Sequence, residues 1–188
     1  MYKAFDEGKN ILSVDLEDNE AILTFLKTNS VPLMDEIGPD NYSSYVELGV
    51  PIAFFFYSSP EERKLGSVFD SIAKKHKGVV SFAYIDAVKF GGHAKSLNVK
   101  EDWPALGIQN PTTQAKFPYD KSLGFTEKAL SKYFQDFVDG KLVPSQKSEP
   151  IPEDNSGPVK IIVGKNFNEI ALDKKHDVFV EIYAPWCM

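Results

Sequence analysis

Apolar residues recur along most of the chain at spacings typical of alternating strands and helices. Period-two and continuous apolar runs predict strands at 31–37, 51–57, 79–86, 103–108 and 114–119. Helical spacing predicts helices near 39–48, 60–76, 92–97 and 126–138. The resulting order is βαβαβαββα, which predicts one complete α/β domain of parallel strands joined by helical crossovers and closed by an antiparallel hairpin.

Shorter patterned segments flank this domain. Residues 2–10 predict a strand ending in a turn, and residues 17–20 begin an amphipathic helix. Residues 141–158 contain four prolines among polar residues, which oppose regular hydrogen bonding and predict a linker. Residues 159–167 then predict a strand and a helix, and residues 177–182 a further strand. The two ends of the chain are therefore predicted to contain strands and helices but no hydrophobic core of their own.

The chain contains an internal repeat. Residues 52–60, Ile-Ala-Phe-Phe-Phe-Tyr-Ser-Ser-Pro, align at a constant offset with residues 178–186, Val-Phe-Val-Glu-Ile-Tyr-Ala-Pro-Trp. The chain's single cysteine, Cys187, follows the second copy, and Glu61 stands at the matching position of the first. The repeat indicates two related modules, of which only the second carries a thiol.

Three motifs together resemble protein disulfide isomerases. They are Pro152-Glu153-Asp154, Val163-Gly164-Lys165-Asn166-Phe167 and Ala184-Pro185-Trp186-Cys187. The resemblance implies a thioredoxin-like fold for residues 31–139, preceded by the tail of another redox-inactive thioredoxin-like domain in 1–30. It implies a linker at 140–158 and the start of a catalytic domain at 159–188. The chain is then expected to be part of an isomerase that forms and rearranges disulfides in the endoplasmic reticulum lumen, without a cofactor.

The resemblance also assigns catalytic roles. Cys187 matches the first active-site cysteine, whose partner is absent because Met188 stands where a glycine would continue the motif. Glu181 matches a buried proton-relay glutamate, whereas the first repeat has Phe55 there. Residues 31–140 contain no cysteine, so this domain cannot perform thiol chemistry. Pro104, after Trp103, occupies the place of a cis-proline, and an aromatic residue before proline favours the cis bond.

A groove for unfolded or misfolded polypeptide is the main site that the resemblance implies for residues 31–139. Its matching residues are Ile37, Tyr42, Val46, His93, Ser96, Leu97 and Ala115, to which geometry adds Tyr45 and Phe90. Tyr42, Val46 and Leu97 could equally be core residues, and His93 could equally be a helix cap or surface residue. Ile151 in the linker matches an apolar residue that covers the groove, and Asn155 replaces a larger aromatic, so we expect a weak cap.

Charge and composition narrow the function. The formal net charge is −6, which argues against nucleic acid or an anionic membrane as a partner. No apolar run approaches the roughly 20 residues that span a bilayer, and the three histidines lack metal-ligand spacing, so no metal site is predicted. Three functions stay open: a polypeptide-binding chaperone module, a thiol oxidoreductase acting through Cys187, and a spacer between catalytic domains. Thiol oxidases are implied partners of the intact protein.

Overall fold

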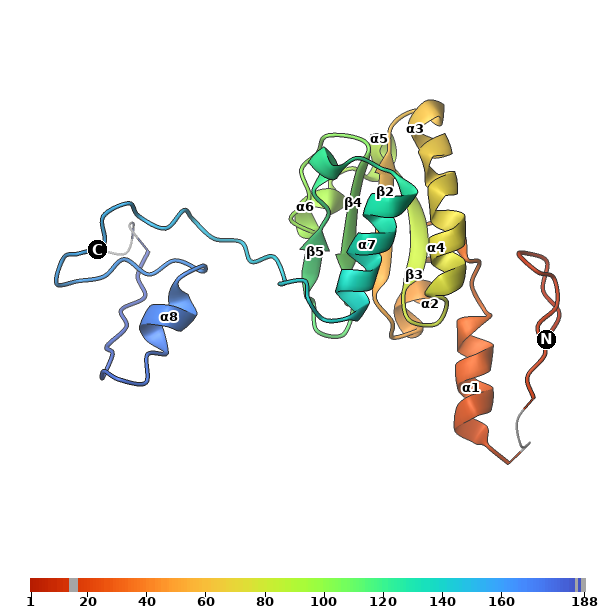
Figure 1. The fold of residues 1–188 in the computed structure, drawn as a ribbon, viewed down its shortest axis with the longest axis horizontal. Helices are drawn as coiled ribbons and strands as arrows, with labels where there is room; N and C mark the ends of the chain where they lie inside the picture. The colour runs from red at the N-terminus through yellow and green to blue at the C-terminus, as the bar shows by residue number, and fades with distance from the viewer. Residues whose placement is uncertain (14–16, 185, 187–188) are drawn as a thin grey trace. The chain divides into compact units, whose positions relative to one another are not determined.

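A five-stranded mixed sheet forms the centre of the larger of two compact units in the computed structural model (Figure 1). The structure describes residues 1–13, 17–184 and 186. The units are residues 1–145 and 146–188. Their boundary falls inside the predicted linker at 140–158, and the finer domain limits stay a prediction.

The strands follow the predicted order along the chain. They are β1 (Met34–Glu36), β2 (Ile52–Tyr57), β3 (Ser81–Asp86), β4 (Ala105–Gln109) and β5 (Lys116–Pro118). In the sheet they lie in the order β1-β3-β2-β4-β5. Strands β1, β3 and β2 run parallel, and β4 is antiparallel to both of its neighbours, β2 and β5. Residues 52–56 are all buried, which explains their continuous apolar pattern, since a central strand is covered on both faces.

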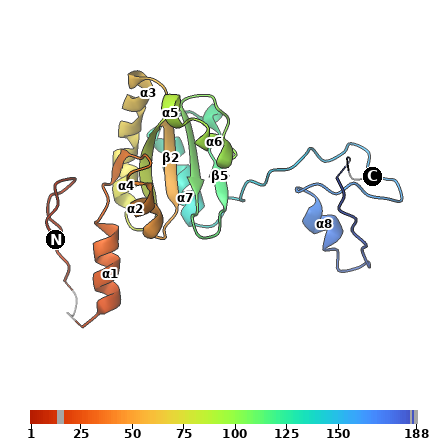
Figure 2. The same cartoon turned by 180° about the vertical axis from the view of Figure 1, so that it is seen from behind.

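Helices cover both faces of the sheet, as the opposite views in Figures 1 and 2 show. One face is covered by α3 (Pro60–Leu65), the short 3₁₀ turn η1 (Gly66–Val68), α4 (Phe69–Lys75) and α7 (Glu127–Val138). The other face is covered by α2 (Tyr42–Glu47), α5 (Ala87–Phe90) and α6 (His93–Ser96). A second 3₁₀ turn, η2 (Lys121–Leu123), precedes α7. The Trp103–Pro104 peptide bond is cis, as predicted.

The single helix predicted at 60–76 is divided into three segments by η1. Gly66 lies so close to the sheet that a Cβ atom there would come within 2.1 Å of Cε1 of Tyr84. The interruption therefore occurs where the helix passes directly over an aromatic ring of β3.

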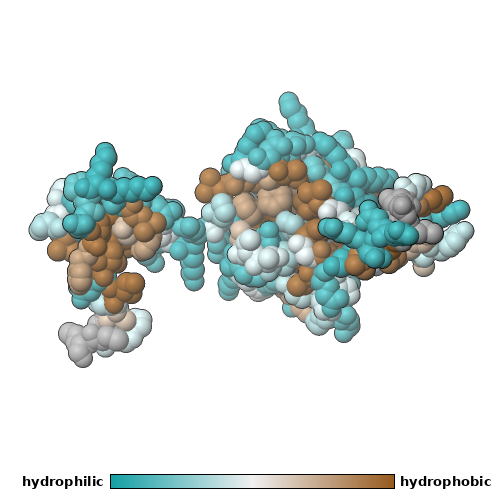
Figure 3. Space-filling view, turned by 90° about the horizontal axis from the view of Figure 1, so that it is seen from below, coloured by the Kyte–Doolittle hydropathy of each residue, from teal (hydrophilic) through white to brown (hydrophobic). Residues whose placement is uncertain are grey.

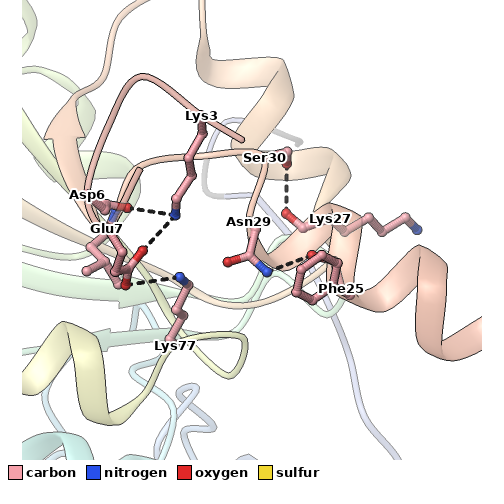
Figure 4. Close-up of polar contacts among 9 residues, drawn as sticks. Lys3, Asp6, Glu7, Phe25, Lys27, Asn29, Ser30 and Lys77 are labelled. Carbon is pink, nitrogen blue, oxygen red and sulfur yellow. Dashed lines mark hydrogen bonds and ion pairs between the residues drawn. The ribbon is translucent and has the colours of Figure 1, made fainter. Parts of the chain in front are cut away.

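The N-terminal segment folds as a turn, and the strand predicted at 2–10 is wrong. Tyr2 and Lys9 form a single antiparallel bridge, and Asp6 and Gly8 have positive φ angles that reverse the chain between them. Figure 4 shows Lys3 between the carboxylates of Asp6 and Glu7, at 3.4 and 2.9 Å. Lys77 lies 3.5 Å from Glu7, so this turn is tied to the loop after α4.

A predicted helix follows this turn. Helix α1 spans Asn19–Thr28, and the side chain of Asp18 caps it by accepting a hydrogen bond from the Ala21 N–H at 2.9 Å. Beyond the helix, the Leu33 N–H donates to Asp6 at 3.0 Å. The N-terminal turn is thus also joined to the residue before β1.

The smaller unit contains the predicted helix, α8 (Phe167–Ala171), but not the predicted strands. Residues 159–163 and 177–182 form no ladder among the described residues. Instead, the side chain of Asn155 exchanges two hydrogen bonds with the backbone of Ile161, at 2.7 and 3.0 Å. A short apolar segment needs neighbouring strands to satisfy its backbone, and no described segment of this unit supplies them.

Candidate functional site

A hollow of about 420 Å³ opens on the face of the sheet that α2, α5 and α6 cover. Its lining comes from the ends of β1 and β3 and from the three short helices. The lining residues are Ile37, Gly38, Pro39, Tyr42, Ile85, Phe90 and His93. Apart from His93, whose imidazole can be protonated, none of these residues has a side chain that is charged near neutral pH. The hollow therefore suits an apolar ligand.

The turn after β1 shapes one wall of the hollow. The Ile37 N–H continues the strand pairing by donating to the Tyr84 carbonyl at 2.9 Å. Asn41 then fixes the turn, because its side-chain oxygen accepts from the Gly38 N–H at 2.8 Å and its amide donates to the Glu36 carbonyl at 2.9 Å. This pair of hydrogen bonds holds Pro39 and the start of α2 at the rim.

The opposite wall follows β3. The Asp86 side chain accepts a hydrogen bond from the Val88 N–H at 3.0 Å, which caps the start of α5. Phe90, at the end of that helix, is 40% exposed, and Tyr42 across the hollow is 38% exposed. Ile37 and Ile85 are buried at 4% and 3%. The hollow therefore has an aliphatic floor and an aromatic rim. Figure 3, coloured by hydropathy, shows that each unit has apolar surface on the side in view.

His93 is the ionisable imidazole of the hollow. Its ring meets the rings of Phe54 and Tyr42 edge-on, at centroid distances of 5.1 and 6.2 Å. Nδ1 lies 3.2 Å from Oγ of Ser96, whereas Nε2 is buried and has no hydrogen-bond partner among the described residues. Burial lowers the pKa of His93 from its ordinary value of 6.5, so the ring is neutral at neutral pH.

Of the nine residues predicted to bind polypeptide, Ile37, Tyr42, Phe90 and His93 line the hollow. Tyr45 and Leu97 are buried at 1% and 0% and belong to the hydrophobic core on this face, so neither reaches the surface of the hollow. For Leu97 this is the core alternative that the sequence left open. Both side chains belong to one buried cluster with residues of β2 and β4, among them Phe54, Phe56 and Ala105. Val46 packs against the same core without lining the hollow.

Two further predicted residues lie apart from the lining. Ser96 is exposed on α6 and reaches the site only through its contact with His93. Ala115 lies in the hairpin between β4 and β5, where its N–H faces the Thr113 hydroxyl at 3.4 Å. Sequence reasoning missed Gly38, Pro39 and Ile85. A Gly-Pro pair directly after a predicted strand was a signal for Gly38 and Pro39. The sequence carried no such signal for Ile85, because β3 is buried on both faces.

The remaining predicted residues lie in the smaller unit. Cys187 is outside the described residues, and Glu181 is exposed because the strand expected to bury it does not form. Ile151 is 51% exposed. The catalytic and capping roles of these three residues stay predictions. No group of three or more potential metal ligands occurs in the part of the chain that the structure describes.

The first repeat, residues 52–60, ends at the first residue of α3, and no cysteine lies there. At α3, the Ser59 hydroxyl accepts from the Glu62 N–H at 3.3 Å, and the Glu62 carboxylate accepts from the Ser58 N–H at 2.6 Å. Ser59 thus caps the helix start, and the Glu62 carboxylate holds the residue before the cap. Glu61, which matches Cys187, is exposed beside it.

Comparison with known proteins agrees with this architecture. The profile of the family described as "Thioredoxin-like domain" matches residues 1–136. The chain belongs to the thioredoxin-like domain family. The thioredoxin-like fold predicted from the sequence is confirmed. In the thioredoxin-like domain, the hollow lies on the sheet face opposite α3, α4 and α7.

The resemblance to protein disulfide isomerases is also confirmed. The chain is 49% identical over its whole length to the protein disulfide-isomerase of Humicola insolens and 44% identical to that of Aspergillus niger. It is 32% identical to the protein disulfide-isomerase of Oryctolagus cuniculus, again over its whole length. The chain spans only 37%, 36% and 38% of these relatives, respectively.

Solved structures show the same fold at low sequence identity. The bb fragment of ERp72 has a TM-score of 0.53 and 20% identity, over 76% of this chain and 65% of that one. The zinc-bound form of human ERp44 has a TM-score of 0.52 and 18% identity, over 70% of this chain and 38% of that one. No helix in the described ranges is both long and apolar enough to cross a membrane.

Proposed function

We propose that the thioredoxin-like domain binds unfolded or misfolded polypeptides in the hollow, as the client-binding part of a protein disulfide isomerase. The observation that carries this proposal is an apolar hollow with an aromatic rim on a domain that has no cysteine. Exposed apolar lining of this kind is a feature of ligand and protein binding sites. In this proposal the domain binds polypeptide and takes no part in thiol chemistry, because it contains no cysteine.

Binding is expected to be weak and tolerant of sequence. One aromatic client side chain buries about 150–250 Å², which corresponds to roughly 4–6 kcal/mol at about 25 cal/mol per Å². Loss of translational and chain freedom offsets much of this gain. A client would therefore dissociate readily, which suits repeated binding while its disulfides are rearranged elsewhere in the isomerase.

Disulfide chemistry belongs to the second repeat in this proposal. Cys187 and Glu181 would act there, with the relatives' description as protein disulfide-isomerases in support. The endoplasmic reticulum lumen as location, and thiol oxidases as partners of the intact protein, follow from the same family. The linker residue Ile151 would compete with clients for the hollow.

Binding of a labelled, carboxymethylated and therefore permanently unfolded polypeptide tests the proposal. Phe90→Asp places a charge at the rim and should weaken binding at least tenfold, because a carboxylate resists burial against an apolar client. Val88→Asp is the matched control, since Val88 is 77% exposed on the same helix and does not line the hollow. It should bind as the unchanged protein does.

The same assay separates the other two functions. Cys187→Ser should leave binding intact under our proposal. Absence of saturable binding by the unchanged protein would favour a spacer. A carboxymethylated polypeptide cannot form a mixed disulfide, so the oxidoreductase alternative is tested with the same polypeptide carrying its disulfides: loss of its capture on Cys187→Ser alone would favour attack of the thiolate on a client disulfide, with release of a client thiolate.

A further inference from the structure

The segment that joins the two compact units is held by hydrogen bonds on either side. On the side of the larger unit, the Ser145 N–H donates to the Lys116 carbonyl of β5 at 2.7 Å. The side-chain amide of Asn98 donates to the carbonyl oxygen and to the hydroxyl of Ser145, each at 3.3 Å. Leu142 packs against the hydrophobic core on the face of the sheet that α7 covers. Residues 140–145 of the predicted linker therefore belong to the larger unit.

Asn98 can hold Ser145 because its own backbone is fixed. Its φ angle of 57° is left-handed, a conformation that asparagine and glycine adopt more readily than other residues. The Asn98 N–H donates to the Lys95 carbonyl at 3.1 Å, and the Val99 N–H donates to the Ala94 carbonyl at 2.9 Å, which ends α6. Ala94 is fully buried. The amide of Asn98 therefore extends from the end of a helix that is anchored in the core.

Ser148 holds the chain on the smaller unit. Its hydroxyl accepts a hydrogen bond from the Lys165 N–H at 3.0 Å and donates to the Glu149 carbonyl at 2.8 Å. A Cβ atom at Gly164 would lie 3.0 Å from Cβ of Ser148 and 3.2 Å from the Lys147 carbonyl oxygen. The chain therefore passes directly over the backbone of Gly164, where any larger residue would crowd it.

Asn155 makes a second attachment on this side. Its side chain accepts from the Ile161 N–H at 2.7 Å and donates to the Ile161 carbonyl at 3.0 Å, as the backbone of a paired strand residue would. Asn166, which is 3% exposed, fixes the same segment, because its amide donates to the Ile161 carbonyl at 3.2 Å and its oxygen accepts from the Val163 N–H at 2.7 Å. Residues 148–155 are thus held at both of their ends.

We propose that the joint between the two units consists of Gln146 and Lys147, and that residues 148–155 are a strap carried by the smaller unit. Both joint residues are exposed, and neither forms a hydrogen bond within the described ranges. Each has two soft backbone dihedral angles, about which the chain beyond it can turn. Ile151 lies inside the strap, so it moves with the smaller unit and is not part of a free linker. The inference goes beyond the proposed function, because the division of the linker does not depend on client binding.

NMR relaxation of the backbone amide nitrogens in the full 188-residue chain tests this division. Apart from prolines, residues 142–145 and 148–155 should have order parameters of about 0.85, and Gln146 and Lys147 should fall below about 0.6. Uniformly low order parameters across 141–158, or uniformly high ones, would overturn the inference. Client binding is measured separately, so either result leaves the proposed function standing.

Two variants test the two attachments one at a time. Asn98→Gly suits the left-handed backbone and removes the side-chain amide, so low order parameters should extend to residues 143–145 and leave the strap unchanged. Asn155→Ala should lower the order parameters of the strap and leave 143–145 unchanged. Gln114→Gly is the matched control for Asn98→Gly, because Gln114 also has a left-handed φ, of 60°, and its side chain donates to the Pro111 carbonyl within the β4–β5 hairpin. An unchanged profile in both Asn98→Gly and Asn155→Ala would overturn the inference.

Discussion

The imidazole of His93 meets the ring of Phe54 edge-on, with centroids 5.1 Å apart. Phe54 is a fully buried residue of the central strand β2, so the hollow is built directly onto the core of the thioredoxin-like domain. The imidazole of His93 therefore packs against the hydrophobic core. The pKa of His93 therefore reports how well the imidazole is shielded from solvent beside the hollow.

The pKa of His93 should be measurably below 6.5 in the free protein. The groups that face the ring are Tyr42 from α2, Phe54 and Phe56 from β2, and Ser96 from its own helix, and none of them is charged at neutral pH. Proton NMR of the imidazole through a pH titration checks this. A midpoint at or above 6.5 would mean that the ring is solvated.

Protonation of His76 at acidic pH should lower the unfolding free energy of the domain. His76 is 5% exposed, and burial together with the neighbouring charge of Lys75 lowers its pKa. The unfolded chain then binds a proton more readily than the folded one. Stability is fully present above the unfolded pKa of about 6.5 and decreases as pH falls from there to the lower folded pKa.

Urea unfolding between pH ~7 and ~5 measures this loss, since the ordinary histidine pKa lies in that window. His76→Phe should reduce the dependence of unfolding free energy on pH. His176→Phe is the control, because His176 is exposed in the smaller unit. Equal pH dependence in the His76 variant and the unchanged protein would contradict the assignment.

Gly66→Ala should destabilise the domain by about 1–3 kcal/mol, because the added methyl group would overlap Tyr84. Tyr84 cannot move freely, since the Arg63 guanidinium carbon lies 3.0 Å from the centre of its ring. Gly92→Ala is the matched control: no atom lies within 4 Å of a Cβ there, and its φ of −57° suits alanine. Denaturant unfolding should show no loss for Gly92→Ala, and equal losses would remove the packing explanation.

Leu97→Ala should cost about 2–5 kcal/mol of unfolding free energy, as expected for a fully buried leucine. If Leu97 instead lined an open groove, the same change would alter client affinity and leave stability within about 0.5 kcal/mol. Thermal or urea unfolding beside a client-binding assay distinguishes these results.

Backbone amides of residues 159–163 and 177–182 should exchange with solvent much faster than those of β2 and β3. The first two segments form no strand ladder in the described structure, whereas β2 is paired on both sides. Hydrogen exchange followed by mass spectrometry measures the difference. Strong protection of these segments would contradict the prediction and indicate that they pair with other parts of the chain or with a neighbouring chain.

The sequence predicted the sheet well because β2 and β3 are buried on both faces, and their apolar runs report that burial directly. Residues 177–182 have a similar local pattern, but a strand also needs partners, which local pattern does not reveal. Leu97 illustrates the limit at the site. The helix α6 has only four residues, so its spacing could not show that Leu97 packs beside Gly107 of β4.

The sequence predicted the partly exposed aromatic residues of the hollow better than its buried aliphatic residues. Tyr42 and Phe90 both line the hollow and are partly exposed, as predicted for a binding surface. Ile85 was missed because alternate residues of a doubly covered strand all look alike in sequence. Which of them borders a hollow depends on how completely the helices cover that face.

Contacts between client and hollow test the central claim most directly. With isoleucine methyl groups labelled, NMR can detect Overhauser effects from the aromatic protons of an unfolded, carboxymethylated polypeptide. The account predicts contacts to Ile37 and Ile85, which line the hollow, and none to Ile72, which lies in the core on the other face of the sheet. Contacts confined to other surfaces, with Ile37 and Ile85 silent at saturation, would contradict it.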